Sequence, residues 1–360
     1  MLLKNKFIYR RLMAVFFSIK NYAVFAALLC TFSAVYAQVN GCPDPAANNY
    51  KSAATVNDGS CTYKAVSIKP AFNANLNTKL NETSGLLWWN NQLWTHNDSG
   101  GEPALYAVDS STGKVIRKVT VSNATNVDWE DLAQDDTYIY IGDIGNNTNG
   151  NRQDLKIYKV KKSDVLSKTS VQATVISYSY NDQTNFAATG NNNTNFDCEA
   201  LIAYGDSLFL FSKDWIDNKT RLYELPKAAG TYTAVKIGEL NVQGLITGAE
   251  IIADKRVIVL TGYSASVSPF IYLLYDFTGN QFFGANKRKV GIKQSFLQLE
   301  GICATTDTSF SISNERLETI ITTKAKLQTL NLTSILNPYY STLPATQVPA
   351  VTYTVVHSFK

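Results

Sequence analysis

A short pattern recurs along the chain at intervals close to fifty residues. Five segments begin a β-rich run and share a small or acidic residue at one point: TSGLLW, WEDLAQ, CEALIA, AEIIAD and LEGICA. The aligned residues are spaced 46, 69, 51 and 50 positions apart, and they are Ser84, Glu130, Glu199, Glu250 and Glu300. A period of this length is typical of folds built from repeated supersecondary units.

Within each repeat, short β-rich runs alternate with turns of Asn, Asp, Gly and Ser. Runs such as TYIYIGD and SLFLFSKD are followed by further runs such as KIYKV and RLYEL. No long stretch has helical periodicity, so the chain is predicted to be all-β. About fifty residues per four-stranded unit predicts a single β-propeller with five blades. The one long interval contains an Asn-rich insertion, Tyr180–Asn195, that is predicted to be a loop.

The fifth repeat has only three strands by Leu332. We expect Tyr63–Phe72, which precedes the first repeat, to supply the fourth, because closure by the other end of the chain removes exposed sheet edges. Six blades are the alternative, if residues 343–359 contribute another sheet. The expected organisation is a signal peptide (1–37), a small module (38–63), the propeller (64–335) and an extension or extra strands (336–360).

The first 37 residues have the features of a secretory signal peptide. An apolar run, Tyr22–Tyr36, is followed by a cleavage site with Val35 and Ala37 at positions −3 and −1. A membrane anchor is the competing interpretation, but the run is short for a span. We therefore expect a protein that is secreted, periplasmic or held at the cell surface. The basic residues of this segment are Lys4, Lys6, Arg10, Arg11 and Lys20.

Charge gives no reason to expect a nucleic-acid partner. Removal of the signal peptide takes away five positive charges and no negative one, so the formal net charge changes from +4 to −1. The mature chain is expected to be a monomer without a membrane span.

Two of the five cysteines, Cys42 and Cys61, frame a small segment rich in Gly, Asn and Asp. Such a segment cannot form its own core, and an exported compartment permits a disulfide between them. The elements GC, D, A, NY and DGSC resemble a short module of secreted and surface proteins of some bacteria. Cys198 and Cys303 lie in strand-like segments and are expected to be free buried thiols. Cys30 belongs to the signal peptide.

In a propeller, the first strand of each blade lines a central channel. The aligned residues Ser84, Glu130, Glu199, Glu250 and Glu300 should therefore converge on one axis. Two residues earlier, on the same strand face, are Glu82, Asp128, Asp197, Gly248 and Gln298. This channel would hold seven carboxylates, and neither layer contains a basic residue.

Several carboxylates in one channel cannot all remain ionised without a cation, because desolvation and repulsion favour protonation. Calcium accepts irregular sets of oxygen ligands, and an extracellular compartment supplies it. The sequence therefore predicts a structural or catalytic calcium ion at the five aligned residues. The alternative is a water-filled channel in which the carboxylates bond to backbone amides and solvent.

The arrangement resembles the calcium-dependent apyrases, which are soluble nucleotidases with a five-bladed propeller and a central calcium ion. The resemblance implies the metal site at Ser84, Glu130, Glu199, Glu250 and Glu300. It does not extend to the reaction, because the turn DSSTG lacks an arginine of that family and Glu250 stands where those enzymes often have Ser. The marks SGL, NDSG, DWED and GDIGNN resemble a broader set of secreted bacterial propellers, which implies fold and export alone.

The turns after the second strand of each repeat should emerge on one rim of the propeller. With Arg152, they would bring together Asp98, Asp143, Lys213, Asp214, Arg316, Trp94 and Trp215. Mixed charges and aromatic rings beside a metal can bind a polar ligand, although Asn, Asp and Gly also serve turns for backbone reasons. A histidine-based site would depend on His96, and no nucleophile elbow, HExxH or phosphate loop is present.

Three functions fit these features. The favoured one is a secreted, calcium-stabilised binding or surface-associated protein. The alternative is a metal-dependent phosphoester or nucleotide hydrolase in which Asp98 and Asp143 orient water and Lys213, Arg152 or Arg316 holds phosphate. The third is glycan binding by Trp94 and Trp215 at the rim.

Overall fold

The predicted β-rich runs form strands in the computed structural model, which describes residues 38–284, 286–318 and 322–344. The chain divides into two units, Met1–Val39 and Asn40–Lys360, and every element described here belongs to the second. The predicted signal peptide lies outside the described residues, as do residues 345–359 of the alternative sixth blade. No helix in the described part of the chain has the length and apolarity needed to cross a membrane.

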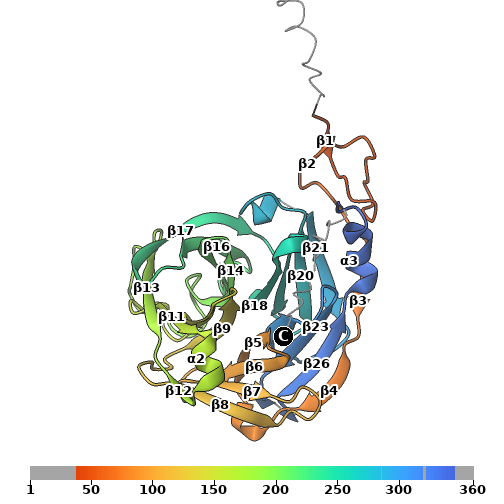
Figure 1. Ribbon diagram of the computed structural model, residues 1–360. Helices are drawn as coiled ribbons and strands as arrows, with labels where there is room; N and C mark the ends of the chain where they lie inside the picture. The colour runs from red at the N-terminus through yellow and green to blue at the C-terminus, as the bar shows by residue number, and fades with distance from the viewer. Residues whose placement is uncertain (1–37, 285, 319–321, 345–360) are drawn as a thin grey trace, which may run out of the picture. The chain divides into compact units, whose positions relative to one another are not determined.

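Five blades, each with four main strands, make the protein a β-propeller, and the blades are arranged around one axis (Figure 1). Two blades share one eight-stranded hydrogen-bonded sheet, and two others each include a fifth short strand. Blade 1 consists of β5 (Thr83–Trp89), β6 (Gln92–Asn97), β7 (Ala104–Val108) and β8 (Val115–Val121). Blade 2 consists of β9 (Trp129–Gln134), β10 (Tyr138–Asp143), β11 (Lys156–Lys161) and β13 (Thr174–Tyr180). Blade 3 consists of β14 (Cys198–Tyr204), β15 (Ser207–Ser212), β16 (Thr220–Pro226) and β17 (Gly230–Leu240).

Blade 4 consists of β18 (Leu245–Ile252), β19 (Val257–Tyr263), β20 (Pro269–Tyr275) and β21 (Asn286–Ile292). Blade 5 consists of β22 (Leu299–Ala304), β23 (Ser309–Asn314), β26 (Lys326–Asn331) and β4 (Ala71–Asn75). The inner strands β5, β9, β14, β18 and β22 contact one another in a ring around the axis. The predicted all-β propeller with five blades is therefore confirmed.

Short elements complete the described structure. The remaining strands are β1 (Asn40–Gly41), β2 (Val56–Asn57), β3 (Ser67–Ile68), β12 (Ser170–Val171), β24 (Leu317–Glu318) and β25 (Thr322–Thr323). The helices are α2 (Lys162–Ser167) and α3 (Thr333–Tyr340), with 3-10 turns η1 (Thr78–Leu80), η2 (Ala253–Lys255) and η3 (Phe282–Gly284). The Asn-rich insertion after β13 contains no strand or helix, as predicted.

Apolar side chains fill the spaces between neighbouring blades. Leu105 of β7 and Ile139 of β10 belong to the cluster between blades 1 and 2, and a similar cluster lies between every other pair of neighbours. Each fully buried Leu, Ile or Phe contributes roughly 1.5–3 kcal/mol. Blades 2 and 3 are also joined at their outer edges, where β13 and β17 pair in parallel. This pairing covers two sheet edges that would otherwise be exposed.

The closing strand is β4, which starts later than the predicted segment Tyr63–Phe72. β4 pairs antiparallel with β26, whereas β3 pairs in parallel with β21 of blade 4 (Figure 1). Pro70 separates β3 from β4, and proline has no N–H group with which to continue a ladder. Residues 67–75 therefore extend the outer edges of two blades, blade 4 through β3 and blade 5 through β4, whereas the prediction involved blade 5 alone.

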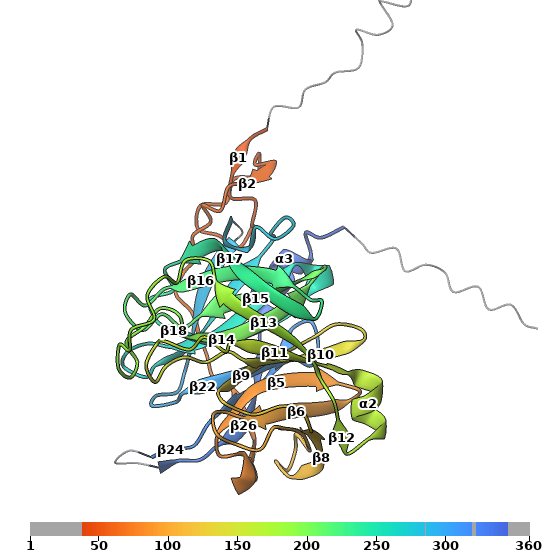
Figure 2. The ribbon, with the colours of Figure 1, turned by 90° about the vertical axis from the view of Figure 1, so that its left-hand side faces the viewer.

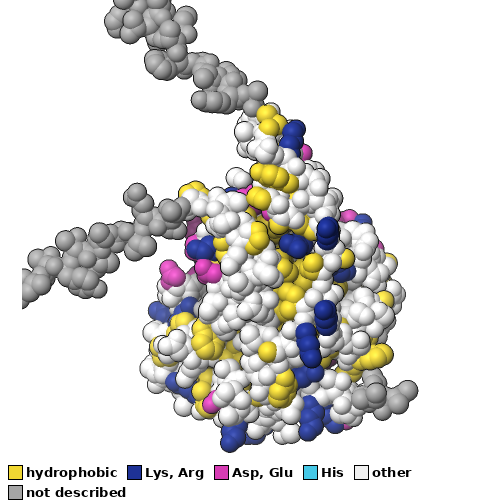
Figure 3. Space-filling model, turned by 90° about the vertical axis from the view of Figure 1, so that its right-hand side faces the viewer, with side chains coloured by type: hydrophobic (Ala, Val, Ile, Leu, Met, Phe, Trp, Pro, Cys, Tyr) yellow, Lys and Arg dark blue, Asp and Glu magenta, His cyan; other side chains and the backbone are white. Residues whose placement is uncertain are grey.

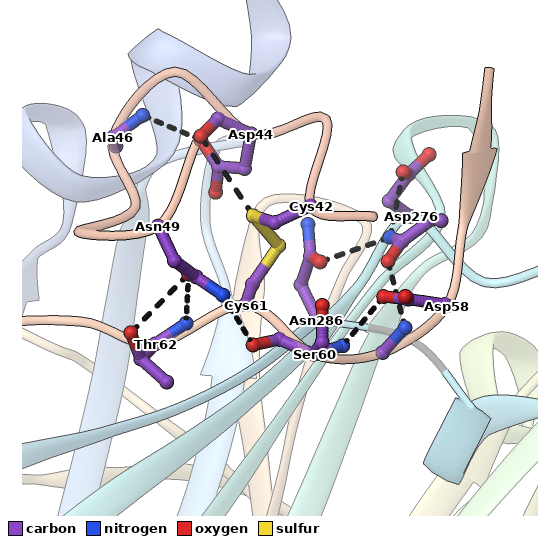
Figure 4. Close-up of a disulfide and its surroundings, with 12 residues drawn as sticks. Cys42, Asp44, Ala46, Asn49, Asp58, Ser60, Cys61, Thr62, Asp276 and Asn286 are labelled. Atoms are coloured by element: carbon purple, nitrogen blue, oxygen red, sulfur yellow. Dashed lines mark hydrogen bonds between the residues drawn. A yellow bond between two sulfur atoms is a disulfide. The ribbon is translucent and has the colours of Figure 1, made fainter. Parts of the chain in front are cut away.

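The small N-terminal module is held by the Cys42–Cys61 disulfide, as predicted (Figure 4). Asp44 accepts hydrogen bonds from the hydroxyls of Tyr63 and Tyr275, at 2.8 and 2.6 Å. Asn57 donates to Asp276 and Asn286, which both appear in Figure 4. These contacts fix the module to blade 4. Cys198 and Cys303 are free and buried, as predicted.

We predict that Ala74→Glu in β4 lowers the free energy of unfolding by about 2–4 kcal/mol, because Ala74 is buried and the new carboxylate would have no partner. The matched variant Ala71→Glu, at an exposed position of the same strand, should change it by less than about 0.5 kcal/mol. Denaturant unfolding of both variants provides the measurement. Equal effects would contradict the assignment of β4 as the closing strand.

Candidate metal centre

Every inner strand contains a β-bulge near the position that the sequence alignment singled out. In β9, both Glu130 and Asp131 lie between the ladder pairs that flank Gly142 of β10. A bulge interrupts the alternation of side chains and changes their direction. Two consecutive residues of β9 can therefore turn toward the channel, whereas strict alternation would send one of them outward.

The bulges correct the alignment of the fourth repeat. The bulge residue of β14 is Glu199, and that of β18 is Thr247. Glu250 lies three residues further along β18, where its carboxylate accepts hydrogen bonds from the N–H groups of Ile251 and Ala304, at 2.9 and 3.0 Å. The five equivalent positions, which we call the ring, are therefore Ser84, Glu130, Glu199, Thr247 and Glu300.

The two hydroxyl residues of the ring connect neighbouring inner strands. Ser84 donates to the backbone carbonyl of Glu130, and Thr247 donates to that of Leu299. The ring layer therefore contains three carboxylates, where the sequence alignment predicted four.

Seven carboxylates meet around the ring, and we call them the channel cluster. They are Asp98, Asp128, Glu130, Asp197, Glu199, Glu300 and Glu315. One oxygen from each of Asp98, Asp128 and Glu130 lies within 4.8 Å of the other two. The same limit holds for Glu130, Asp197 and Glu199. Glu130 is thus common to two sets of oxygens spaced closely enough to share one cation.

Glu130 is the least satisfied member of the channel cluster. Its side chain is 2% exposed, and its Oε1 atom is buried without a hydrogen-bond partner. Gly145 allows this arrangement, because a Cβ atom there would lie 2.1 Å from Glu130 Oε1 and 2.4 Å from Asp128 Oδ2. Both oxygens therefore lie beside the backbone of Gly145, which has no side chain.

Lys213, which the sequence analysis placed at the rim, brings a positive charge to the ring carboxylate Glu199. Its Nζ atom donates to both oxygens of Glu199, at 2.8 and 2.9 Å, and its side chain is 6% exposed. The ammonium also lies over the rings of Trp215 and Tyr263. One lysine thus neutralises Glu199 and leaves the other carboxylates of the channel cluster with an excess of negative charge.

Burial and mutual repulsion both favour protonation of Asp98, Asp128 and Glu130. Desolvation, followed by the charge of Glu315, raises the pKa of Asp98 to about 7. Desolvation, followed by the charges of Asp98 and Asp197, raises the pKa of Asp128 to about 7. The pKa of Glu130 is raised well above its ordinary value by the same causes. A divalent cation would remove this repulsion and favour the ionised forms.

Asp131 lies beside the channel cluster and was not predicted. Its carboxylate is fully buried and accepts backbone N–H donors from three inner strands: Leu132, Leu201 and Ala249, at 2.8, 2.9 and 3.1 Å. The other four inner strands have a small residue directly after the ring position: Gly85, Ala200, Gly248 and Gly301. At the three glycines, the backbone of the neighbouring inner strand lies where a Cβ atom would be.

The other charged rim candidates are already paired. Asp143 accepts a hydrogen bond from Arg152 at 2.8 Å and from the N–H of Asp128 at 3.1 Å. Arg316 pairs with Glu318 in an exposed turn. Asp214 pairs with Arg221 of β16. These pairs support the walls of the site, and Arg152 and Arg316 are not free cations.

Two aromatic candidates of the rim are buried in blade 1. Trp94 has no exposed surface, so it cannot serve as a platform for a sugar. His96 is also fully buried, and desolvation lowers its pKa to about 4, which keeps the imidazole neutral. Trp215 lies at the channel, where its indole N–H donates to Asp197 at 2.8 Å.

Glu315 is the member of the channel cluster that the sequence analysis missed, and a simple rule would have found it beside the predicted Asp98 and Lys213. The residue that directly follows the second strand of blades 1, 3 and 5 contributes to the channel: Asp98, Lys213 and Glu315. The N–H of Asp98 donates to the carbonyl of Glu82, and that of Lys213 donates to the carbonyl of Asp197. These bonds place each side chain beside the entrance of its inner strand.

Comparison with known proteins adds a weak likeness of fold. No protein-family model and no curated protein matches the chain. A solved structure described as a nidogen/laminin complex matches with a TM-score of 0.38 and 10% identity, over 70% of this chain and 76% of that one. A mitotic checkpoint complex matches with a TM-score of 0.32 and 12% identity, over 69% and 63%. The propeller assignment rests on the sheet topology described above.

We predict that the metal-free protein loses stability as the pH rises from about 4 to about 7. These limits are the ordinary pKa of Asp98 and Asp128 in the unfolded chain and their raised pKa in the folded protein. The folded state binds more protons than the unfolded state in this window, so this contribution is complete below pH 4 and lost through pH 7. Thermal unfolding in a chelator should show a flatter profile for the double variant Asp98→Asn, Asp128→Asn. Parallel profiles would contradict the prediction.

Proposed function

We propose that the chain is a secreted binding or surface-associated propeller whose blades are held together by a calcium ion in the channel cluster. One observation carries the metal assignment: Glu130 Oε1 is buried without a partner, and Glu130 supplies an oxygen to both groups of converging oxygens. All these donors are carboxylate oxygens, which suit a hard cation, and calcium accepts irregular geometry more readily than magnesium.

The residues that would hold the ion differ in part from the predicted five. Asp98, Asp128 and Glu130 supply the first group of oxygens, and Asp197 adds a further carboxylate on the side of blade 3. Glu199 is shared with Lys213, and Glu250 is engaged by backbone N–H groups. We therefore place Glu130 at the centre of the site, with Ser84 and Glu199 as its neighbours in the ring.

Export is supported by two features of different kinds. The sequence begins with a segment that has the composition of a signal peptide, and the structure contains a disulfide in the small module. Both features are consistent with an extracellular or periplasmic location.

We predict that calcium at a hundredfold excess over its dissociation constant raises the midpoint of thermal unfolding by roughly 4 °C, because binding to the native state alone adds about 2.7 kcal/mol. Glu130→Gln should abolish the rise. Glu250→Gln is the matched control, since it alters a buried carboxylate outside the channel cluster, and it should keep the rise. Loss of the rise in the control alone would contradict this placement of the ion.

We also predict that the purified protein releases no phosphate from nucleotides in the presence of calcium. The three basic residues considered for a hydrolase each have an acidic partner: Arg152 with Asp143, Lys213 with Glu199, and Arg316 with Glu318. A phosphate group would have to displace one of them. Calcium-dependent release that Asp143→Ala abolishes would overturn the binding function in favour of hydrolysis.

A further inference from the structure

A line of basic residues follows the outer edge of blades 4 and 5. The stretches 63–81, 286–298 and 322–332 contain nine Lys and Arg residues and no Asp or Glu, although the whole chain has 29 acidic residues. Strand pairing brings these stretches together, because β21 pairs with β3 and β4 pairs with β26. Figure 3 shows this face, with Lys and Arg in a column and few acidic side chains among them.

Seven of the nine residues form what we call the basic seam. They are Lys64, Lys69, Lys79, Arg288, Lys293, Lys324 and Lys326. Lys289 is excluded because it bonds to the carbonyls of Val242 and Gln243, and Lys287 because it bonds to those of Gly59 and Phe283.

Neighbouring residues of the basic seam are placed side by side by backbone contacts. The N–H of Lys293 donates to the carbonyl of Ile68, which brings Lys293 next to Lys69. Arg288 lies over the ring of Tyr63, one residue from Lys64, and Lys326 pairs with Asn75. No seam residue forms an ion pair with an acidic residue in the described ranges.

The basic seam is long and narrow. An extended chain rises about 3.3 Å per residue, so the path from Lys64 to Lys79 is at most about 50 Å. Such a line of unpaired positive charge complements an extended polyanion better than a compact ligand. Phe72, which is 59% exposed, lies on this path and offers an apolar surface to the C–H face of a sugar ring. Phe296, which is 66% exposed, lies three residues after Lys293. Single-stranded nucleic acid would require an aromatic platform for each of several successive bases, and the described part of the seam exposes only these two separate phenylalanines.

We propose that the basic seam binds an acidic polysaccharide, with carboxylate or sulfate groups along an extended chain. The contacts would run across the outer strands of blades 4 and 5, away from the ring residues. The proposal is independent of the calcium ion. Outside the three stretches, residues 38–360 contain 29 Asp and Glu and 19 Lys and Arg, so the excess of positive charge is confined to this face.

The test is binding of the purified full-length mature protein to heparin, with neutral dextran and single-stranded DNA as comparison probes. The seam variant Lys64→Gln, Lys69→Gln, Lys293→Gln should weaken heparin binding at least tenfold and lower the slope of log Kobs against log salt by about two. The control Lys114→Gln, Lys161→Gln, Lys168→Gln removes the same charge elsewhere on the exposed surface and should weaken it less than twofold.

All six lysines are exposed, so both variants should remain folded, and thermal unfolding of each variant checks this. Three results would overturn the proposal: no heparin binding at low salt, equal losses in the two variants, or tighter binding of DNA than of heparin. Binding to dextran as strong as to heparin would overturn the role of charge.

Discussion

The structure depends on the convergence of buried carboxylates around one axis. A propeller directs the same position of every blade to its centre, and here that position is acidic in three blades, with further acids from neighbouring turns. Lys213 neutralises one of these groups, and burial makes the rest costly as anions. Either protons or a cation must balance them. The choice between the two determines how firmly the five blades are held at physiological pH.

The same centre explains the pattern of small residues in the inner strands. The neighbouring strand leaves no room for a Cβ atom at Gly85, Gly248 or Gly301. Blade 3 has the next smallest residue, Ala200, at the equivalent position. Asp131 joins three of these strands through their N–H groups. The inner strands are thus joined by a buried carboxylate and, in our proposal, by a calcium ion.

The repeat spacing predicted the architecture because each blade must supply one strand to the channel. It also placed Glu130, Glu199 and Glu300 together. The alignment was wrong at Glu250, because it matched apolar residues without gaps and a β-bulge adds a residue to the strand. It missed Asp131 for the same reason. Asp98 and Lys213 were assigned to the rim, although side chains that follow a second strand turn inward. The start of β4 could not be predicted, because pairing partners of the segment 67–75 are distant in the sequence.

Isothermal titration of metal-stripped protein with calcium at pH 7.5 is the most direct test of the central claim. We predict one calcium ion per chain, with binding accompanied by release of protons from the carboxyl groups of the channel cluster. The proton release would appear as a dependence of the measured heat on the ionisation enthalpy of the buffer. Absence of binding up to about 10 mM, beyond the range of extracellular calcium modules, would contradict the claim. The carboxyl groups would then be balanced by protons and by Lys213 alone.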